Sequence, residues 1–147
     1  MASKSTLLVA GSFLAWGAAV TFSGVVAQGS VAQKTTNDGL YTQAQADGAK
    51  ALYNKVCVDC HPFTVAAKKK PKDLPLGEDP FFEEWEGRSV RELISIIALT
   101  MPNDGSAVIS DQEATDLVAY ILQQNGFPAG SAPLDKSAAA AIERPKK

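Results

Sequence analysis

The residues best suited to chemistry in this chain lie together in one pentapeptide, Cys57-Val58-Asp59-Cys60-His61. Two thiols separated by two residues and followed directly by an imidazole form the pattern at which c-type haem is attached. Each thiol can add to a vinyl group on one porphyrin edge, and the adjacent histidine can then bind the iron. The chain has 2 cysteines and 1 histidine, and all of them lie in this motif. The sequence therefore predicts one covalently attached haem c.

Two other functions of a C-x-x-C pair fit the sequence less well. A thioredoxin-type redox pair requires a strand and a helix near the motif, and no strand pattern is visible there. A closed zinc site usually needs four Cys or His ligands, whereas this chain offers 2 cysteines and 1 histidine.

Met101 is the residue that we expect to bind the iron from the other side. The chain has 2 methionines, and the other is the initiator. Met101 follows a strongly apolar segment and precedes Pro102, which favours an extended backbone before it. A thioether is a soft, neutral ligand, and His/Met ligation raises the haem potential. A gap-filling core methionine, a lysine ligand and an open sixth position are the alternatives.

Length and charge limit the class of function. At 147 residues the chain is long enough for one domain with tails. Its formal net charge of −2 provides no basic footprint for nucleic acid, so we expect no nucleic-acid partner.

Residues 1–27 have the composition of an export segment, because residues 6–27 carry no charge and are mostly apolar. Small residues end candidate cleavage sites at Ala27 and Ala32. A run of about 20 residues is also long enough to span a bilayer. Residues 1–27 are therefore a signal peptide or an N-terminal membrane anchor. In both cases we expect the protein to be periplasmic or otherwise extracytoplasmic, with possible membrane association through residues 6–27.

Helical patterns begin after a polar linker, residues 28–40, and fill most of residues 41–130. Capping-box patterns or a helix-initiating proline mark the predicted helix starts at Thr42, Asp79, Ser89 and Ser110. The last helix is expected to end near Gln124, before Asn125-Gly126. Residues 131–147 are rich in Ala, Ser and Lys, and we expect a flexible tail. The sequence thus predicts an all-α fold, a small bundle of about four helices around one covalently bound haem.

Three further side chains are candidates for contact with the haem. Tyr53 precedes Cys57 by four residues on one helix face, so we expect it to point toward the haem edge or a partner helix. Plain core packing is the alternative. Trp85 follows two phenylalanines, which together should wall a pocket. The indole N–H of Trp85 and the guanidinium of Arg88 could each donate to a haem propionate. Plain packing for Trp85 and a surface position for Arg88 are the alternatives.

The segment 62–79 is a proline-broken loop with one charge cluster, the lysine cluster: Lys68, Lys69, Lys70 and Lys72. It is either a docking patch that steers an acidic redox partner or a solvated loop that happens to be basic.

With these motifs in this order, the chain resembles the class I c-type cytochromes over about residues 41–128. It is most similar to the monohaem cytochrome c domains associated with quinoprotein alcohol dehydrogenases. The resemblance is carried by the haem motif, Ala51-Leu52-Tyr53, Trp85-x-Gly87-Arg88-Ser89, Thr100-Met101-Pro102 and residues 118–130.

The resemblance implies thioether bonds at Cys57 and Cys60, with His61 as proximal and Met101 as distal iron ligand. It also implies that a proline carbonyl accepts the N–H of the proximal imidazole, for which Pro75 is preferred and Pro71 is the alternative. Family members pack their first and last helices at a small residue, and Ala49 occupies that place here.

The expected function is that of an exported, cytochrome c-like monohaem electron carrier, and not of an enzyme. Its expected partners are redox proteins: a dehydrogenase as donor, and an oxidase or another cytochrome as acceptor. Two alternatives stay open. One is a haem-binding subunit of a membrane or periplasmic oxidoreductase complex, and the other is a haem sensor or enzyme with an open distal site.

Overall fold

The computed structural model describes residues 33–146. The predicted export segment, residues 1–27, lies outside this part of the chain. Within residues 33–146, no helix is long and apolar enough to cross a membrane.

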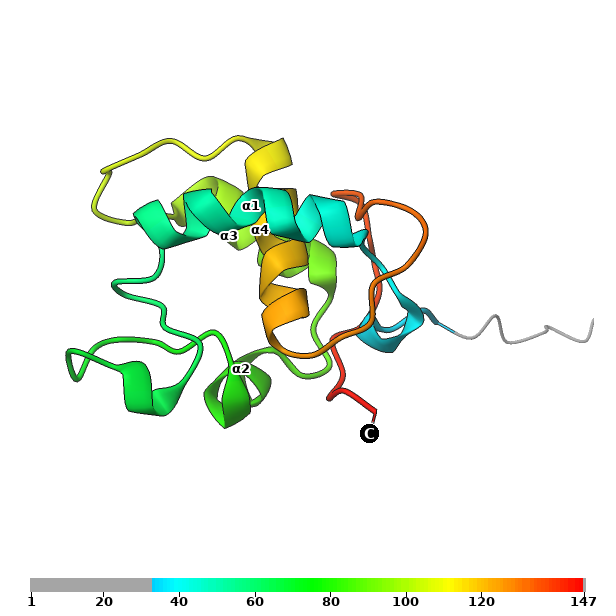
Figure 1. The fold of residues 1–147 in the computed structure, drawn as a ribbon, viewed down its shortest axis with the longest axis horizontal. Helices are drawn as coiled ribbons and strands as arrows, with labels where there is room; N and C mark the ends of the chain where they lie inside the picture. Colours follow the sequence, from blue (N-terminus) through cyan, green and yellow to red (C-terminus); the bar gives the residue numbers. More distant parts are fainter. Residues whose placement is uncertain (1–32, 147) are drawn as a thin grey trace, which may run out of the picture. The chain divides into compact units, whose positions relative to one another are not determined.

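Four α-helices account for most of the regular structure in the described residues (Figure 1). They are α1 (Gln43–Val56), α2 (Glu78–Trp85), α3 (Val90–Thr100) and α4 (Asp111–Gln124). Two short 3-10 helices, η1 (Thr36–Asp38) and η2 (Val65–Ala67), lie in the connecting segments. Residues 33–146 contain two isolated β-bridges and no β-strand. The prediction of a small all-α bundle of about four helices is therefore confirmed.

Helices α1 and α4 pack against each other, and α3 packs on α4 (Figure 1). α1 contributes a narrow face of small residues and one tyrosine, since Ala46, Ala49 and Tyr53 are its buried residues. Ala49 is 4% exposed, so this small side chain lies within the packed core. α4 buries a much broader face, which consists of Ala114, Thr115, Leu117, Val118, Ala119, Tyr120, Ile121 and Leu122.

The three predicted capping residues each begin a helix, but only one completes its capping box. Ser110 and Glu113 bond each other's backbone N–H at the start of α4. At the start of α1, Thr42 accepts the N–H of Gln45, while the Gln45 side chain bonds Asp116 and the backbone of Leu134. A side chain that finds a tertiary partner is no longer available for its own helix end.

Helix α2 begins two residues earlier than expected. Gly77 is its N-cap, and Glu78 has a positive φ of 57°. The carboxylate of Asp79 does not cap the helix, and it forms an ion pair with Arg144 at 2.8 Å. The prediction that Asp79 caps α2 is therefore wrong. Its carboxylate binds a residue that is distant in sequence.

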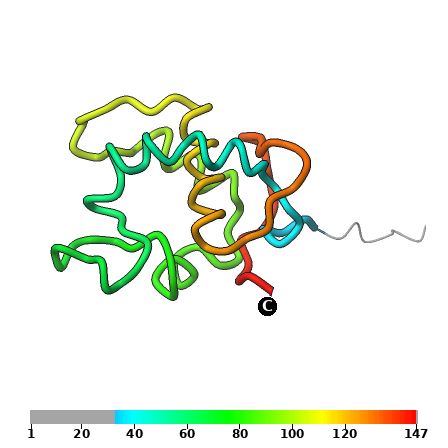
Figure 2. Tube along the Cα trace, in the orientation of Figure 1, coloured from blue at the N-terminus to red at the C-terminus, as the bar shows by residue number. Residues whose placement is uncertain are grey.

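Residues 131–146 differ from the flexible tail that the sequence predicts. Leu134, Ala140 and Ile142 are buried, at 0–5% exposure. The main chain of this segment pairs with residues beside η1 and with the junction between α2 and α3, as in Thr36 N–H to Ala141 O at 2.9 Å. Figure 2 shows this segment returning beside the start of the described chain. The described part of the expected linker, residues 33–40, is thereby tied to the body.

Two glycines permit this return. Gly130 donates its N–H to Tyr41 O at 2.6 Å, and a Cβ on Gly130 would lie 1.9 Å from the carbonyl oxygen of Gly39. Only a residue without a side chain allows the two backbones to approach this closely.

Candidate functional site

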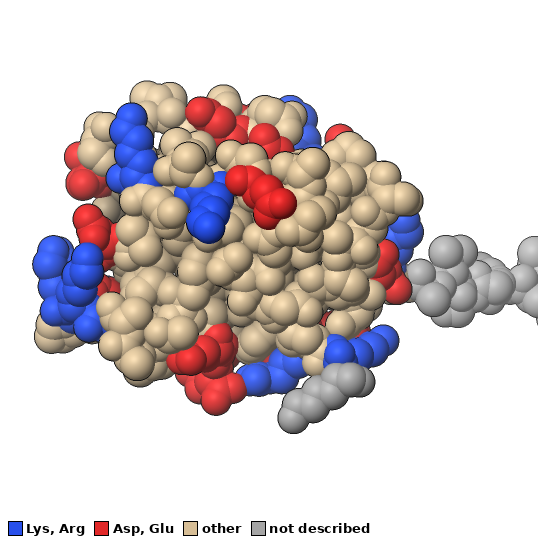
Figure 3. Space-filling model, viewed as in Figure 1, with Lys and Arg blue, Asp and Glu red and all other residues tan. Residues whose placement is uncertain are grey.

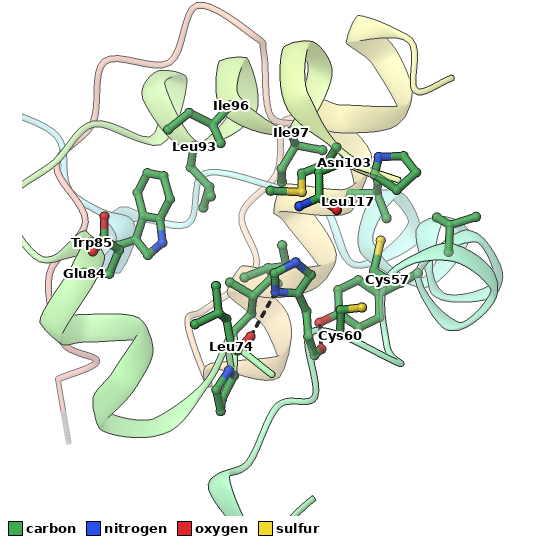
Figure 4. A pocket seen from close by; sticks show the side chains of 18 of the residues that line it. Cys57, Cys60, Leu74, Glu84, Trp85, Leu93, Ile96, Ile97, Asn103 and Leu117 are labelled. Carbon is green, nitrogen blue, oxygen red and sulfur yellow. Dashed lines mark hydrogen bonds between the residues drawn. The ribbon is translucent and has the colours of Figure 1, made fainter. Parts of the chain in front are cut away.

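A cavity of about 620 Å³ lies among the haem motif, α2, α3 and α4 (Figure 4). This volume is within the range of about 300–1,000 Å³ that is usual for cofactor sites. Its apolar lining consists mainly of Leu74, Leu76, Leu93, Ile96, Ile97, Ile109, Leu117 and Ile121. The predicted residues Tyr53, Cys57, Cys60, His61, Pro75, Trp85 and Met101 also line it. The cavity therefore suits a large apolar group that binds to thiol, imidazole and thioether side chains of the protein.

The haem motif begins at the C-terminal end of α1 and lies at the cavity. Cys57 is the C-cap of α1, and the carbonyl of Cys57 accepts the backbone N–H of Cys60 at 3.1 Å and of His61 at 2.8 Å. This turn folds the motif back on itself, so both thiols and the imidazole reach the same cavity. Figure 4 shows Cys57 and Cys60 together on one side of it.

The imidazole of His61 is held by a main-chain carbonyl, but not by that of a proline. Its Nδ1 lies 2.9 Å from the carbonyl oxygen of Leu74, the bond dashed in Figure 4. Because a carbonyl only accepts, Nδ1 carries the proton and Nε2 is left with a free lone pair that could bind a metal.

This hydrogen bond corrects the assignment of the carbonyl to Pro75 or Pro71. The backbone of Leu74 donates to Cys60 O at 2.9 Å, which aligns residue 74 with the haem motif. Pro75 follows and restricts Leu74 to an extended conformation, while the Pro71 carbonyl accepts the Nζ of Lys68. The carbonyl aimed at the ring is therefore the one before the proline.

Met101 is partly buried and lines the cavity from the end of α3. It is the C-cap of that helix, and its N–H donates to Ile97 O at 3.2 Å. In Figure 4, Ile97 and Asn103, which flank Met101 in the sequence, lie across the cavity from Leu74. The methionine thus comes from a different wall than the histidine.

Helix α2 closes the cavity on the side away from the cysteines. Trp85 is 7% exposed and lines the cavity together with Glu84, opposite Cys57 and Cys60 in Figure 4. Arg88 is not among the lining residues. Its guanidinium lies 4.0 Å from the centre of the Trp85 ring and is bonded to Glu92 and Glu84. These bonds, chiefly the one to Glu92, raise the pKa of Arg88.

The thiol chemistry of the motif differs from that of a redox dithiol. Burial raises the pKa of Cys57 to about 11, so this thiol is neutral at physiological pH. Catalytic dithiols have the opposite property, a lowered pKa that yields thiolate. This result disfavours the thioredoxin-type alternative.

The lysine cluster belongs to a loop that is tied to the haem motif. Asp73 is 1% exposed, and its Oδ2 accepts the backbone N–H groups of Lys69 and Lys70, each at 2.8 Å. The Nζ of Lys69 pairs with Asp59, inside the motif, at 2.8 Å. The loop that presents the Leu74 carbonyl is thus held chiefly by the buried carboxylate of Asp73.

Replacement of Asp73 with asparagine should make the stability of the protein less dependent on pH. Burial alone would raise the pKa of Asp73, but the amides of Lys70 and Lys69 and the nearby lysine charges hold it below its ordinary value. A lowered native pKa stabilises the fold above the unfolded pKa, and this contribution is lost as the pH falls through the native value. Asp73→Asn should therefore lower the free energy of unfolding at neutral pH and reduce its fall in acid.

Denaturant titrations at neutral and acidic pH measure both effects. Asp135→Asn is the comparison variant, since Asp135 also accepts a backbone N–H, that of Ser137, but is exposed. Because water screens an exposed carboxylate, Asp135→Asn should change the stability and its acid dependence much less than Asp73→Asn. An Asp73→Asn protein with the wild-type acid dependence would contradict this role for Asp73.

Sequence reasoning missed several residues of the site. Leu74 acts through its main chain, and the only signal for it is its place before Pro75. Asn103 and Asp104 also line the cavity, and they belong to a loop whose path the sequence does not determine.

An apolar cavity reached by a C-x-x-C-H turn at the end of the first of four helices defines a class I c-type cytochrome. The family model described as "Cytochrome C oxidase, cbb3-type, subunit III" matches residues 44–121, more than half of the chain, and the chain belongs to this cytochrome c family. Neither the curated proteins nor the solved structures provide a match. Membership means covalently bound haem c, haem-based electron transfer with redox-protein partners and an extracytoplasmic location.

Proposed function

We propose that this chain is a monohaem electron carrier that passes single electrons between a dehydrogenase and a respiratory acceptor, such as an oxidase or another cytochrome. The observation that carries the proposal is that the haem motif and Met101 line one apolar cavity from different elements, the turn after α1 and the end of α3. A similarity to the cytochromes of quinoprotein alcohol dehydrogenases makes such an enzyme one candidate donor.

In this proposal Cys57 and Cys60 hold the haem by thioether bonds, and His61 Nε2 and Met101 Sδ hold its iron. When bound, the haem supplies reversible one-electron exchange. The Leu74 carbonyl keeps the imidazole proton on Nδ1, 2.9 Å away. Leu and Ile side chains of the lining limit the access of water. With His61 and Met101 both as ligands, the iron would have no coordination position for a substrate, which favours a carrier over an enzyme.

Trp85 is proposed as a donor to a haem propionate. Cys57 and Cys60 would hold the vinyl groups of the haem, and Trp85 lies on the other side of the cavity (Figure 4). Arg88 then acts through Trp85, because its guanidinium stacks on the indole ring and is itself fixed by Glu84 and Glu92.

The partner is proposed to dock beside the two segments that carry the iron ligands. Among residues 33–146, the large apolar side chains that are exposed are Val65, Leu74, Leu99 and Val108. Each belongs to a segment near His61 or Met101 in the sequence. Figure 3 shows Lys and Arg atoms gathered at the edge where Figure 1 places the loop with η2. An apolar contact with acidic groups beside it would suit this surface.

A subunit role is the second candidate function. The matched family is described as a subunit of cbb3-type cytochrome c oxidase, which favours a haem subunit of an oxidoreductase complex, anchored through residues 6–27. The mass of the mature chain distinguishes a free carrier from an anchored subunit. Loss of the first 27 or 32 residues supports a free carrier, and retention of residues 6–27 supports an anchored subunit.

Carbon monoxide tests the proposed ligand set. If Met101 occupies the sixth position, the reduced protein should bind carbon monoxide slowly or not at all at neutral pH. Rapid binding would contradict the carrier and favour a sensor or enzyme with an open distal site.

A further inference from the structure

Tyr53 contacts the haem motif at both of its ends. Its side chain is fully buried, and its hydroxyl donates a hydrogen bond to the main-chain carbonyl of His61. The main-chain carbonyl of Tyr53 accepts the N–H of Cys57 at 2.9 Å and the N–H of Val58 at 3.1 Å. One residue of α1 therefore holds the first and the last residue of the pentapeptide.

The position of this hydroxyl is determined by an aromatic cluster. The ring of Tyr53 stacks on Phe63, with centroids 4.6 Å apart and planes at 16°. Tyr120 of α4 meets the Tyr53 ring edge-on at 5.3 Å and 62°. Packing on two sides leaves the ring little freedom to rotate away, so the hydroxyl is held where the carbonyl of His61 lies.

We propose that Tyr53 is a positioning residue for the proximal iron ligand. Its hydroxyl fixes the main chain of His61 and, through it, the orientation of the imidazole against the Leu74 carbonyl. This inference rests on the proposed function, because it concerns the histidine that is assigned to the haem iron.

The effect on the haem has a definite sign. A hydrogen bond from Nδ1–H to a carbonyl makes the other ring nitrogen a stronger donor to the metal. A stronger donor stabilises ferric over ferrous iron. Loss of the Tyr53 hydroxyl should loosen His61, weaken its bond to Leu74 and raise the reduction potential.

The chain offers a matched pair of variants for the test. Tyr53→Phe keeps the ring and removes one buried hydroxyl. Tyr41→Phe does the same elsewhere, because the hydroxyl of Tyr41 donates to Phe127 O at 2.7 Å, Tyr41 is 1% exposed, and it does not line the cavity. Both variants lose a buried tyrosine-to-carbonyl hydrogen bond, so they should lose similar stability. Only Tyr53→Phe should change the haem.

The readouts are proton NMR of the ferric haem methyl groups, which reports the imidazole orientation, and redox titration. In Tyr53→Phe we expect a changed methyl shift pattern and a ferrous-to-ferric ratio about twofold or more higher at a fixed poise. Tyr41→Phe should match the wild type in both. Wild-type shifts and ratio in a folded Tyr53→Phe protein would overturn the proposal.

Phe63→Leu is the second variant, for the case that Tyr53→Phe does not assemble. It removes the stacked ring that orients Tyr53 and leaves the hydroxyl in place, so it should produce a smaller change of the same kind. An unchanged methyl pattern in Phe63→Leu would then overturn the proposal. Failure of the proposed function is a different result, since it would appear as a wild-type protein without low-spin haem.

Discussion

Replacement of Met101 with alanine is expected to leave the haem attached and to lower its reduction potential. The proposed thioether bonds at Cys57 and Cys60 do not involve Met101, so attachment should persist. A neutral thioether favours ferrous iron, and its loss should shift the potential by on the order of 0.1 V or more, within the about 0.8 V over which axial ligands act. Redox titration and carbon monoxide binding measure the change, and binding should become rapid.

Leu99→Ala is the matched control for Met101→Ala. Leu99 belongs to the same end of α3, is 82% exposed and does not line the cavity. Its truncation should leave the potential and the carbon monoxide kinetics unchanged. If Met101→Ala also kept the wild-type potential, the sulfur would not be on the iron and Met101 would be a core residue.

Replacement of His61 with alanine is expected to prevent assembly of a stable holoprotein. The iron would lose its proximal nitrogen, and the Leu74 carbonyl would lose the donor 2.9 Å away. Changes to groups that merely orient a ligand cost about 10–100-fold in metal affinity, so loss of the ligand itself should reduce the yield of haem protein by at least about tenfold. Haem staining of the denatured protein and the visible spectrum measure this yield.

Asp59→Ala provides the comparison within the same motif. It removes the ion pair with Lys69, which joins two exposed side chains, and such pairs contribute little. This variant should mature with a normal spectrum. A normal low-spin spectrum in His61→Ala would show instead that another residue binds the iron.

The features that could be predicted from the sequence are those that depend on local interactions. Cys57, Cys60 and His61 are a contiguous motif, and the capping residues Ser89 and Ser110 act on the helix that follows each of them. Such features need no knowledge of tertiary structure. The all-α class and the arrangement of the motif at the end of a helix could therefore be predicted.

The parts that the sequence did not reveal depend on contacts between distant residues. The C-terminal segment is held largely by main-chain hydrogen bonds, such as Val90 N–H to Ala140 O at 2.9 Å, and a run of alanines provides no periodic pattern. The start of α2 lies two residues before the predicted one, and the carboxylate of Asp79 pairs with Arg144, a residue distant in sequence. The Leu74 carbonyl is a main-chain group, so no side chain marks it.

The hydrogen bond of the Tyr53 hydroxyl is another feature that the sequence did not reveal. The sequence places Tyr53 on the helix face of Cys57 and allows contact with the haem edge, with a partner helix or with the core. In the structure it lines the cavity and is fully buried. Its bond to the carbonyl of His61 crosses a turn, and helical spacing does not predict such a bond.

The most direct test of the account is a reduced-minus-oxidised visible spectrum of the purified mature protein, recorded with the far-red region of the ferric form. We predict the sharp bands of low-spin haem c and a weak far-red band from sulfur bound to ferric iron. A colourless protein, or a mass without a covalently attached porphyrin, would contradict the central claim that Cys57, Cys60 and His61 hold a haem.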